Sequence, residues 1–464
     1  MGRFFTLLFL ILIIGGAIYI YPQIEWHAPE INIKLDSNDV GMKPFDIEVS
    51  DRGTGLKNVT VLLVNSDGET VLLNREYPGG VKGDRININI DAKKLGIKNG
   101  PAELRVAAVD NSRLRFFSGN RTVVTKNINL DLVPPAVDLL STENYINHGG
   151  SALVIYKTSP DVVKSGVTIG GYFFPGYKGN FAEDDVYLVF FAYPYNVPPG
   201  ESIALIAEDG AGNKKSVNVP FTLKDVAYRK SNLNISNDFI QNVIIPLSGE
   251  SGETDYKKIF LKVNSDLRKK NDAQIKEVST HSKDEILWNG PFHQLSNSQV
   301  EANFADERTY IFNNEPIDKQ YHLGYDLAVT KRYPVEAANN GIVVYAGELG
   351  IYGNTVIIDH GMGVNTLYGH MSTIDVKVGD KIKTNQILGK TGQTGLAAGD
   401  HLHYGVYVSG VAVRPVEWWD DKWIKDNVIL KIDQARAEFG TKGSDKPRNK
   451  PGELKIDNIR KKPR

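Results

Sequence analysis

HLGYD at residues 322–326 and HLH at residues 401–403 bring three histidines and one aspartate into a single C-terminal segment of the chain. Five of the nine histidines lie between residues 322 and 403. Neutral imidazole and carboxylate are the ligands of a catalytic zinc that keeps one position open for water. Further histidines beside such a site supply general acid/base chemistry. The pattern therefore favours a zinc hydrolase.

The same two stretches predict β structure around the site. His401 and His403 are two residues apart, so in a strand both rings project from one face. His322 and Asp326 are four apart, a spacing that would align them on a helix. Gly324 and the β-rich residues after Asp326 favour a loop that enters a strand instead.

Alternating apolar runs over residues 341–346, 354–359 and 401–408 extend this expectation. We expect a β-rich domain with barrel-sandwich topology over residues 310–420.

In this order, the motifs resemble the LytM/lysostaphin-type (M23 family) zinc metallopeptidases, which cut peptidoglycan cross-bridges. A single His-x-His is a weak signal, but its joint occurrence with His-x-x-x-Asp and Tyr-Gly-His is specific. The resemblance covers about residues 308–420, roughly a quarter of the chain. The similar stretches are residues 322–328, 341–343, 358–361, 367–370, 391–395 and 400–404.

The resemblance implies a role for each histidine of the motifs. His322, Asp326 and His403 would hold one Zn²⁺ per chain and leave a fourth position for water. His401 would be the general base, and His370 would help to stabilise the tetrahedral oxyanion. Two neutral imidazoles and one carboxylate leave such a site at net +1, so the metal can acidify its water and polarise the scissile carbonyl.

Four further residues are interpreted more cautiously. Arg308 lies near the place where related enzymes often carry a basic residue. His360 is expected to be structural, because the ligand set is already complete without it. Trp418 and Trp419 are expected to pack the end of the domain, with a glycan platform as the alternative.

The composition bounds the remainder of the chain. A length of 464 residues predicts three or four domains. The balance of 54 basic and 55 acidic side chains gives no sign of nucleic-acid binding. The absence of cysteine excludes disulfides, thiolate zinc sites and cysteine nucleophiles.

The N-terminus carries an uncharged apolar run behind Arg3. It predicts a transmembrane anchor over residues 4–21, with a cleaved signal peptide or a core helix as alternatives. Arg3 before the run and Glu25 after it would place the bulk of the chain in the periplasm or at the cell exterior, anchored to the inner (cytoplasmic) membrane by a single pass.

Residues 28–224 alternate between short strands and turns rich in Gly, Asn and Asp, which is typical of antiparallel sandwiches. A repeat at an offset of about 100 residues predicts two immunoglobulin-like domains over residues 28–133 and 134–224. The Asp-Gly clusters at residues 51–56 and 209–213 are interpreted as hairpin turns, with a calcium loop as the alternative.

The last two segments flank the β-rich domain. Residues 225–309 lose the strand pattern and predict a mostly helical connector, in which Ser236 or Asn237 could cap a short helix. Residues 421–464 predict a helix over residues 422–439 and then a basic disordered tail.

The chain is therefore expected to be mainly β, multidomain, and a zinc endopeptidase that acts on the stem or cross-link peptides of peptidoglycan. One alternative is a non-catalytic wall-binding regulator that activates an amidase. A scaffold whose sandwiches bind an envelope protein partner is another. The connector could also cover the zinc before activation.

Overall fold

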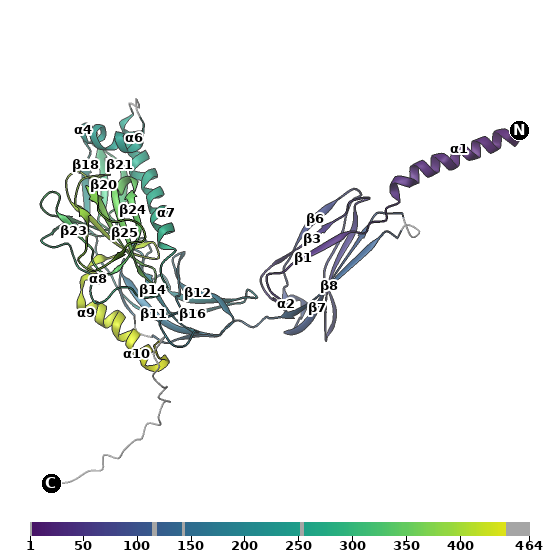
Figure 1. The fold of residues 1–464 in the computed structure, drawn as a ribbon, viewed down its shortest axis with the longest axis horizontal. Coiled ribbons are helices and arrows are strands. Elements are labelled where there is room, and N and C mark those ends of the chain that lie inside the picture. The colour runs from purple at the N-terminus through teal and green to yellow at the C-terminus, as the bar shows by residue number, and fades with distance from the viewer. Residues whose placement is uncertain (1, 114–117, 142–143, 251–254, 442–464) are drawn as a thin grey trace, which may run out of the picture. The chain divides into compact units, whose positions relative to one another are not determined.

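The computed structural model describes residues 2–113, 118–141, 144–250 and 255–441. The chain divides into two compact units. The first consists of residues 1–136 with the short segments 161–163 and 207–215, and the second contains the other residues (Figure 1). Most of the basic tail predicted for residues 440–464 lies outside the described residues.

The first unit begins with helix α1 (Gly2–Ile20) and the turn η1 (Tyr21–Gln23). Within the described part of the chain, no helix combines the length and the apolar character needed to cross a bilayer. The transmembrane anchor predicted for residues 4–21 is therefore not supported.

The first unit continues as a β-sandwich. One sheet has the order β1-β3-β6 and the other the order β2-β8-β7-β4-β5. Every second residue of β3 is buried, as the apolar alternation of its sequence predicts. The elements are β1 (Glu30–Lys34), β2 (Asp39–Val40), β3 (Phe45–Ser50), β4 (Leu56–Asn65), β5 (Gly68–Glu76), β6 (Gly83–Ile88), α2 (Ala92–Leu95), β7 (Gly100–Asp110) and β8 (Arg121–Leu130).

Residues 137–224 form further strands in sheets of order β14-β11-β9, β13-β12-β15-β16 and β10-β17. β14 is buried along its whole length, and its Phe190 packs against Trp288 and Trp418. The strands are β9 (Val137–Leu139), β10 (Tyr145–Asn147), β11 (Ser151–Thr158), β12 (Val162–Ile169), β13 (Tyr172–Pro175), β14 (Val186–Ala192), β15 (Ala204–Asp209), β16 (Lys214–Asn218) and β17 (Thr222–Lys224). That either set of strands is immunoglobulin-like stays a prediction.

The segment predicted as a connector contains helices, the strands at residues 230–234 and 299–302, and the start of a third strand at residue 307. Ser236 caps the first helix by accepting a hydrogen bond from Phe239 N at 3.1 Å. Strand β18 (Lys230–Asn234) pairs in parallel with β20 (Glu307–Phe312). The helical elements are α4 (Asn237–Phe239), η2 (Ile240–Ile244), α5 (Ile245–Ser248), α6 (Tyr256–Leu261), η3 (Lys262–Leu267) and α7 (Arg268–Ser279).

The C-terminal domain is built on a sheet of order β19-β22-β30-β26-β25-β24-β28, with β31 paired to β30. Smaller sheets have the orders β23-β29-β27 and β18-β20-β21. Elements of this domain not yet given are β19 (Gln299–Ala302), β21 (Glu315–Tyr321), β22 (Tyr325–Ala328), β23 (Pro334–Glu336), β24 (Gly341–Glu348), η4 (Gly350–Tyr352), β25 (Asn354–Gly361), β26 (Val364–Met371), β27 (Thr373–Ile374), β28 (Lys381–Ile382), β29 (Ile387–Lys390), β30 (Leu402–Val408) and β31 (Val411–Val413).

The connector and the C-terminal domain share one hydrophobic core. Ile244, Phe260 and Ile275 of the helices are buried in the same cluster as Ile357 and Leu367 of the sheet. α7 runs beside this sheet (Figure 1). The apolar side chains of the connector helices thus belong to the core of the C-terminal domain.

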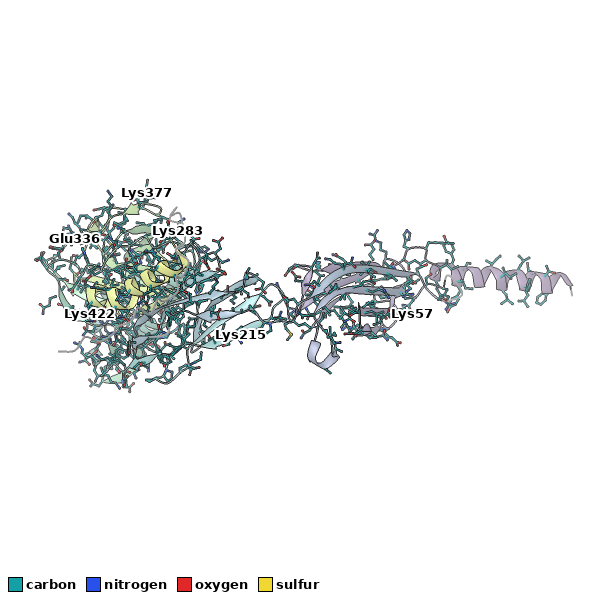
Figure 2. All side chains as sticks on the ribbon, turned by 90° about the horizontal axis from the view of Figure 1, so that it is seen from below. Lys57, Lys215, Lys283, Glu336, Lys377 and Lys422 are labelled. Atoms are coloured by element: carbon teal, nitrogen blue, oxygen red, sulfur yellow. The ribbon has the colours of Figure 1, made fainter. Side chains whose placement is uncertain are left out.

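Helices α8 (Pro415–Trp419), α9 (Asp421–Ile424), η5 (Lys425–Ile429) and α10 (Leu430–Phe439) follow the last strand. Trp418 is fully buried against Phe190, Trp288 and Phe292, so it packs the domain end as predicted. Lysines such as Lys422 on α9 remain at the surface (Figure 2).

Candidate active site

The sheet register brings the two decisive motifs together. Asp326 on β22 pairs directly with His403 on β30, although 77 residues separate them in the sequence. His322 lies in the loop before β22, and His401 lies at the start of β30. The loop that enters a strand is as Gly324 and the β-rich residues after Asp326 predicted, and the shared face of the His-x-His pair is as its spacing predicted.

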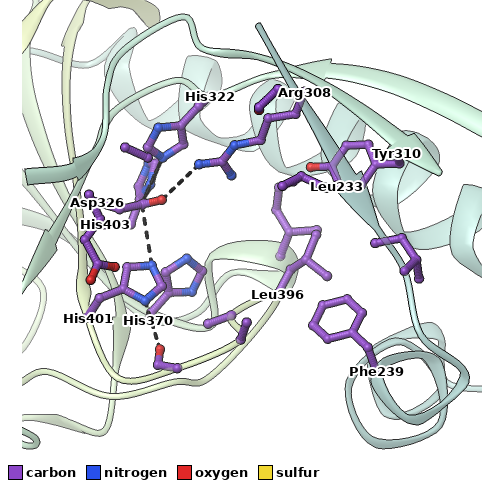
Figure 3. Close-up of a pocket in the computed structure, with 18 of the residues that line it drawn as sticks. Leu233, Phe239, Arg308, Tyr310, His322, Asp326, His370, Leu396, His401 and His403 are labelled. Carbon is purple, nitrogen blue, oxygen red and sulfur yellow. Dashed lines mark hydrogen bonds and ion pairs between the residues drawn. The ribbon is translucent and has the colours of Figure 1, made fainter. Parts of the chain in front are cut away.

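Three donor atoms converge at this pair of strands (Figure 3). His322 Nε2 lies 2.9 Å from Asp326 Oδ1, and His403 Nδ1 lies 3.2 Å from the same oxygen. The two ring nitrogens are 3.0 Å apart. Ligands at zinc distances of 2.0–2.1 Å in a tetrahedron stand roughly 3.3 Å apart. The three side chains therefore fit a zinc ion.

The surrounding residues fix the orientation of these side chains. His322 Nδ1 donates a hydrogen bond to the Asn303 carbonyl at 3.0 Å, which leaves Nε2 unprotonated in the neutral ring. Arg308 donates to Asp326 Oδ2 at 3.0 Å and so occupies the carboxylate oxygen that the histidines do not contact. Such outer contacts orient ligands and tune their basicity.

His401 and His370 lie beside the three donors, with ring centroids 4.8 Å apart. His401 Nδ1 donates to the Gly399 carbonyl at 2.9 Å, and His401 Nε2 lies 3.5 Å from Asp326 Oδ1. His370 Nδ1 donates to the Thr394 carbonyl at 2.8 Å. In their neutral forms both rings thus have the Nε2 lone pair available.

The pKa values of the cluster favour an ionised Asp326 beside neutral His370 and His403 rings. Burial alone would raise the pKa of Asp326, but the neighbouring histidines, His322 foremost, hold it well below its usual range. Burial lowers the pKa of His370 to about 3 and that of His403 to about 4. Burial also acts to lower the pKa of His401, but the hydrogen bond and the charge of Asp326, together with the Gly399 carbonyl, outweigh it and the pKa is raised.

Gly324 makes room for a site ring. A Cβ added to Gly324 would stand 2.7 Å from His403 Nε2 and 2.5 Å from the Tyr404 carbonyl oxygen. The glycine inside the HLGYD motif is therefore a steric requirement of the site.

The site opens into a cavity of about 710 Å³. One wall comes from the M23-like motifs and another from the connector, which contributes Leu233 and Phe239 (Figure 3). Arg229 and Arg268 also line it. The connector is therefore part of the binding cavity.

Other predicted residues lie outside the donor cluster. His360 is fully buried, and its ring nitrogens contact the Asn340 carbonyl at 2.6 Å and Thr366 Oγ1 at 2.7 Å, which is a structural role. The ring of Tyr352 packs against His403 at 5.3 Å between centroids, a contact that the sequence did not reveal.

Comparison with known proteins places these residues in a family. Residues 320–415 match Peptidase family M23, and this range contains every predicted site residue from His322 to His403. The chain is 39% identical over 95 residues to the DD-carboxypeptidase/endopeptidase Mpg of Neisseria meningitidis serogroup B, covering 20% of this chain and 22% of that protein. It is 37% identical over 120 residues to the peptidoglycan DD-endopeptidase ShyA of Vibrio cholerae, covering 25% of this chain and 26% of that protein.

The chain thus spans about a quarter or less of the length of these two relatives. The catalytic domain of lysostaphin from Staphylococcus simulans is 28% identical, with a TM-score of 0.23, covering 26% of this chain and 92% of that domain.

Proposed function

We propose that the M23 peptidase domain at residues 320–415 is a zinc-dependent endopeptidase that hydrolyses peptide bonds in the stem or cross-link peptides of peptidoglycan. The observation that carries the proposal is the convergence of His322 Nε2, His403 Nδ1 and Asp326 Oδ1 to within 3.2 Å of one another. Two imidazoles, one carboxylate and an open cavity are the donor set of a catalytic metal site.

When bound, a zinc ion would acidify its water ligand and polarise the scissile carbonyl. His401 would accept the proton of the attacking water at Nε2, while its Nδ1 stays held by the Gly399 carbonyl. The same ring would then pass the proton to the leaving amine. His370 would donate to the oxyanion from Nε2 in its other neutral tautomer, which gives up the Nδ1 hydrogen bond to Thr394.

The substrate class rests on the named relatives, which are a DD-carboxypeptidase/endopeptidase and a peptidoglycan DD-endopeptidase. A cavity of about 710 Å³ accommodates a short peptide. Because peptidoglycan lies outside the cytoplasmic membrane, we place the activity in the periplasm or at the cell exterior.

The test is digestion of purified peptidoglycan by the zinc-loaded full chain, with and without a chelator. New amino termini are expected, and His401→Ala should lower the rate by a factor of about 10² to 10⁴ while zinc stays bound. His281→Ala is the matched control, because His281 is exposed and lies outside the cavity lining. Asp326→Ala should abolish both zinc binding and cleavage.

Cleavage that survives the chelator, or that is equal in His401→Ala and His281→Ala, would contradict the proposal. Bound zinc without cleavage would also contradict it and would favour a non-catalytic regulator that acts by binding the wall.

A further inference from the structure

Three carboxylates meet at one end of the first sandwich. Glu25 follows turn η1, Asp51 follows β3, and Asp110 ends β7. Each offers an oxygen, and these oxygens lie within 4.8 Å of one another. The residues are only 9%, 4% and 0% exposed, respectively. Within the described ranges, none of the three forms an ion pair with a lysine or arginine.

The hydrogen bonds of the cluster leave one oxygen without a partner. Asp110 accepts from Asn120 N at 2.7 Å and from Asn120 Nδ2 at 2.9 Å. Glu25 Oε2 accepts from Thr54 N at 2.5 Å, and Asp51 Oδ2 accepts from the Gly55 amide. Asp51 Oδ1 is buried and has no hydrogen-bond partner. A buried carboxylate oxygen without a donor is costly unless a cation lies against it.

We propose that Glu25, Asp51 and Asp110 bind a calcium ion. The ligands are all carboxylate oxygens, two on loops and one at the end of β7, which suits the flexible coordination of Ca²⁺ better than the strict octahedron of Mg²⁺. Three carboxylates without a cation repel one another in a buried site.

A second acidic cluster repeats part of this geometry and shows what is distinctive about the first. Asn213 donates from N and Nδ2 to the two oxygens of Asp209 at 2.9 and 3.0 Å, as Asn120 does to Asp110. Asp131 and Asp161 complete the cluster, but Asp161 is exposed. Among its described atoms no buried oxygen lacks a partner. It therefore carries no proposal and supplies a control.

The ion would fasten the segment after η1 to the sandwich. The Glu25 carbonyl already accepts hydrogen bonds from Ser112 Oγ at 3.0 Å and Asn120 Nδ2 at 2.8 Å. Calcium on the Glu25 carboxylate would add a second link at the same residue.

The test uses the full chain, loaded with zinc and freed of calcium, and Tb³⁺ as the probe. Trp26 adjoins Glu25 in sequence, so excitation of tryptophan should sensitise Tb³⁺ emission that Ca²⁺ displaces. Asp51→Asn should weaken Tb³⁺ and Ca²⁺ binding at least ten-fold. Asp161→Asn, the same change in the second cluster, should bind as the wild type does. Glu25→Gln is the second variant if Asp51→Asn does not fold.

Melting curves separate a metal site from a structural carboxylate. Calcium should raise the melting temperature of the wild type and leave that of Asp51→Asn unchanged. Without calcium, Asp51→Asn should melt no lower than the wild type, because it removes one of three like charges. Equal ion binding by wild type and Asp51→Asn would overturn the proposal. A melting temperature of the wild type that does not change with calcium would also overturn it. Peptidoglycan cleavage is measured separately and does not enter this test.

Discussion

Asp326 divides its two carboxylate oxygens between different tasks. Oδ1 contacts His322, His401 and His403, whereas Oδ2 accepts a hydrogen bond from Arg308. The arginine therefore holds the carboxylate in the orientation that presents Oδ1 to the cavity. A ligand without such a partner would lose orientation and part of its affinity for the metal.

Arg308→Ala should weaken zinc binding by about 10- to 100-fold, the usual effect of removing an outer partner of a ligand. A competition titration against a chromophoric chelator measures it. Arg229→Ala is the matched control, because Arg229 lines the same cavity but pairs with Asp306. Equal zinc affinity in the two variants would show that Arg308 does not orient Asp326.

At the residue scale the sequence predicted which side chains meet in the site, because histidine is rare in the chain and the His-x-His spacing suits a strand. It did not predict the tautomer of His322. That tautomer depends on the main-chain carbonyl of Asn303, an acceptor that almost any residue would provide. The contact between Tyr352 and His403 was equally hidden, since no motif marks a packing ring.

At the scale of elements, α7 supports the turn η4. Asn271 Oδ1 accepts a hydrogen bond from Ile351 N at 2.9 Å, and Asn271 is only 5% exposed. A Cβ on Gly350 would stand 2.5 Å from Asn271 Oδ1, so the approach is close. Tyr352, which follows Ile351 in η4, packs against the ring of His403. Helix α7 thus holds η4, and η4 in turn packs against His403, a candidate metal ligand.

Asn271→Ala should destabilise the protein by about 1–3 kcal/mol, because it leaves the buried Ile351 amide without an acceptor. It should also lower peptidase activity, since the turn that bears Tyr352 loosens. Thermal melting and the cleavage rate measure the two effects. Lys270→Ala, an exposed change on the same helix, should alter neither. A fully active, equally stable Asn271→Ala would refute the role of the turn.

The connector helices could be predicted because their apolar residues recur at helical spacing. Strand β18 could not, because its sequence KSNLN carries a single apolar residue. Its pairing with β20 unites segments more than 70 residues apart, and only the folded chain brings that partner near.

At the scale of the whole second unit, Glu417 joins α8 to the strands of residues 137–160. Its carboxylate accepts from Asn147 Nδ2 at 2.7 Å and from Ser151 N at 2.9 Å, and it is 4% exposed. Burial raises the pKa of Glu417 to about 7, although these hydrogen bonds act to lower it. The sequence could not reveal this joint, since a glutamate in a short helix normally faces solvent.

This raised pKa predicts a pH dependence of stability. The folded chain holds the Glu417 proton up to about pH 7, whereas the unfolded chain releases it near its ordinary value of 4.5. The protonated Glu417 therefore contributes its full stabilisation below pH 4.5. This contribution to the free energy of unfolding, up to about 3 kcal/mol, is lost as the pH rises through 7.

Urea unfolding of wild type and Glu417→Gln at pH 5 to 8, followed by tryptophan fluorescence, measures this effect. As the pH rises, the free energy of unfolding of the wild type should fall relative to that of Glu417→Gln. Glu315→Gln, an exposed change, should track the wild type at every pH. If the difference in free energy of unfolding between wild type and Glu417→Gln is the same at every pH, the carboxyl of Glu417 is already ionised at pH 5.

The pairing of Asp326 with His403 also sets the earliest moment at which the candidate metal site can form. A growing polypeptide contains Asp326 before the ribosome reaches β30, and until then His403 is missing. The site can form only after a 77-residue loop has closed, which is a long-range event in folding. Any activity of this site must therefore wait until β30 has been made and has paired with β22.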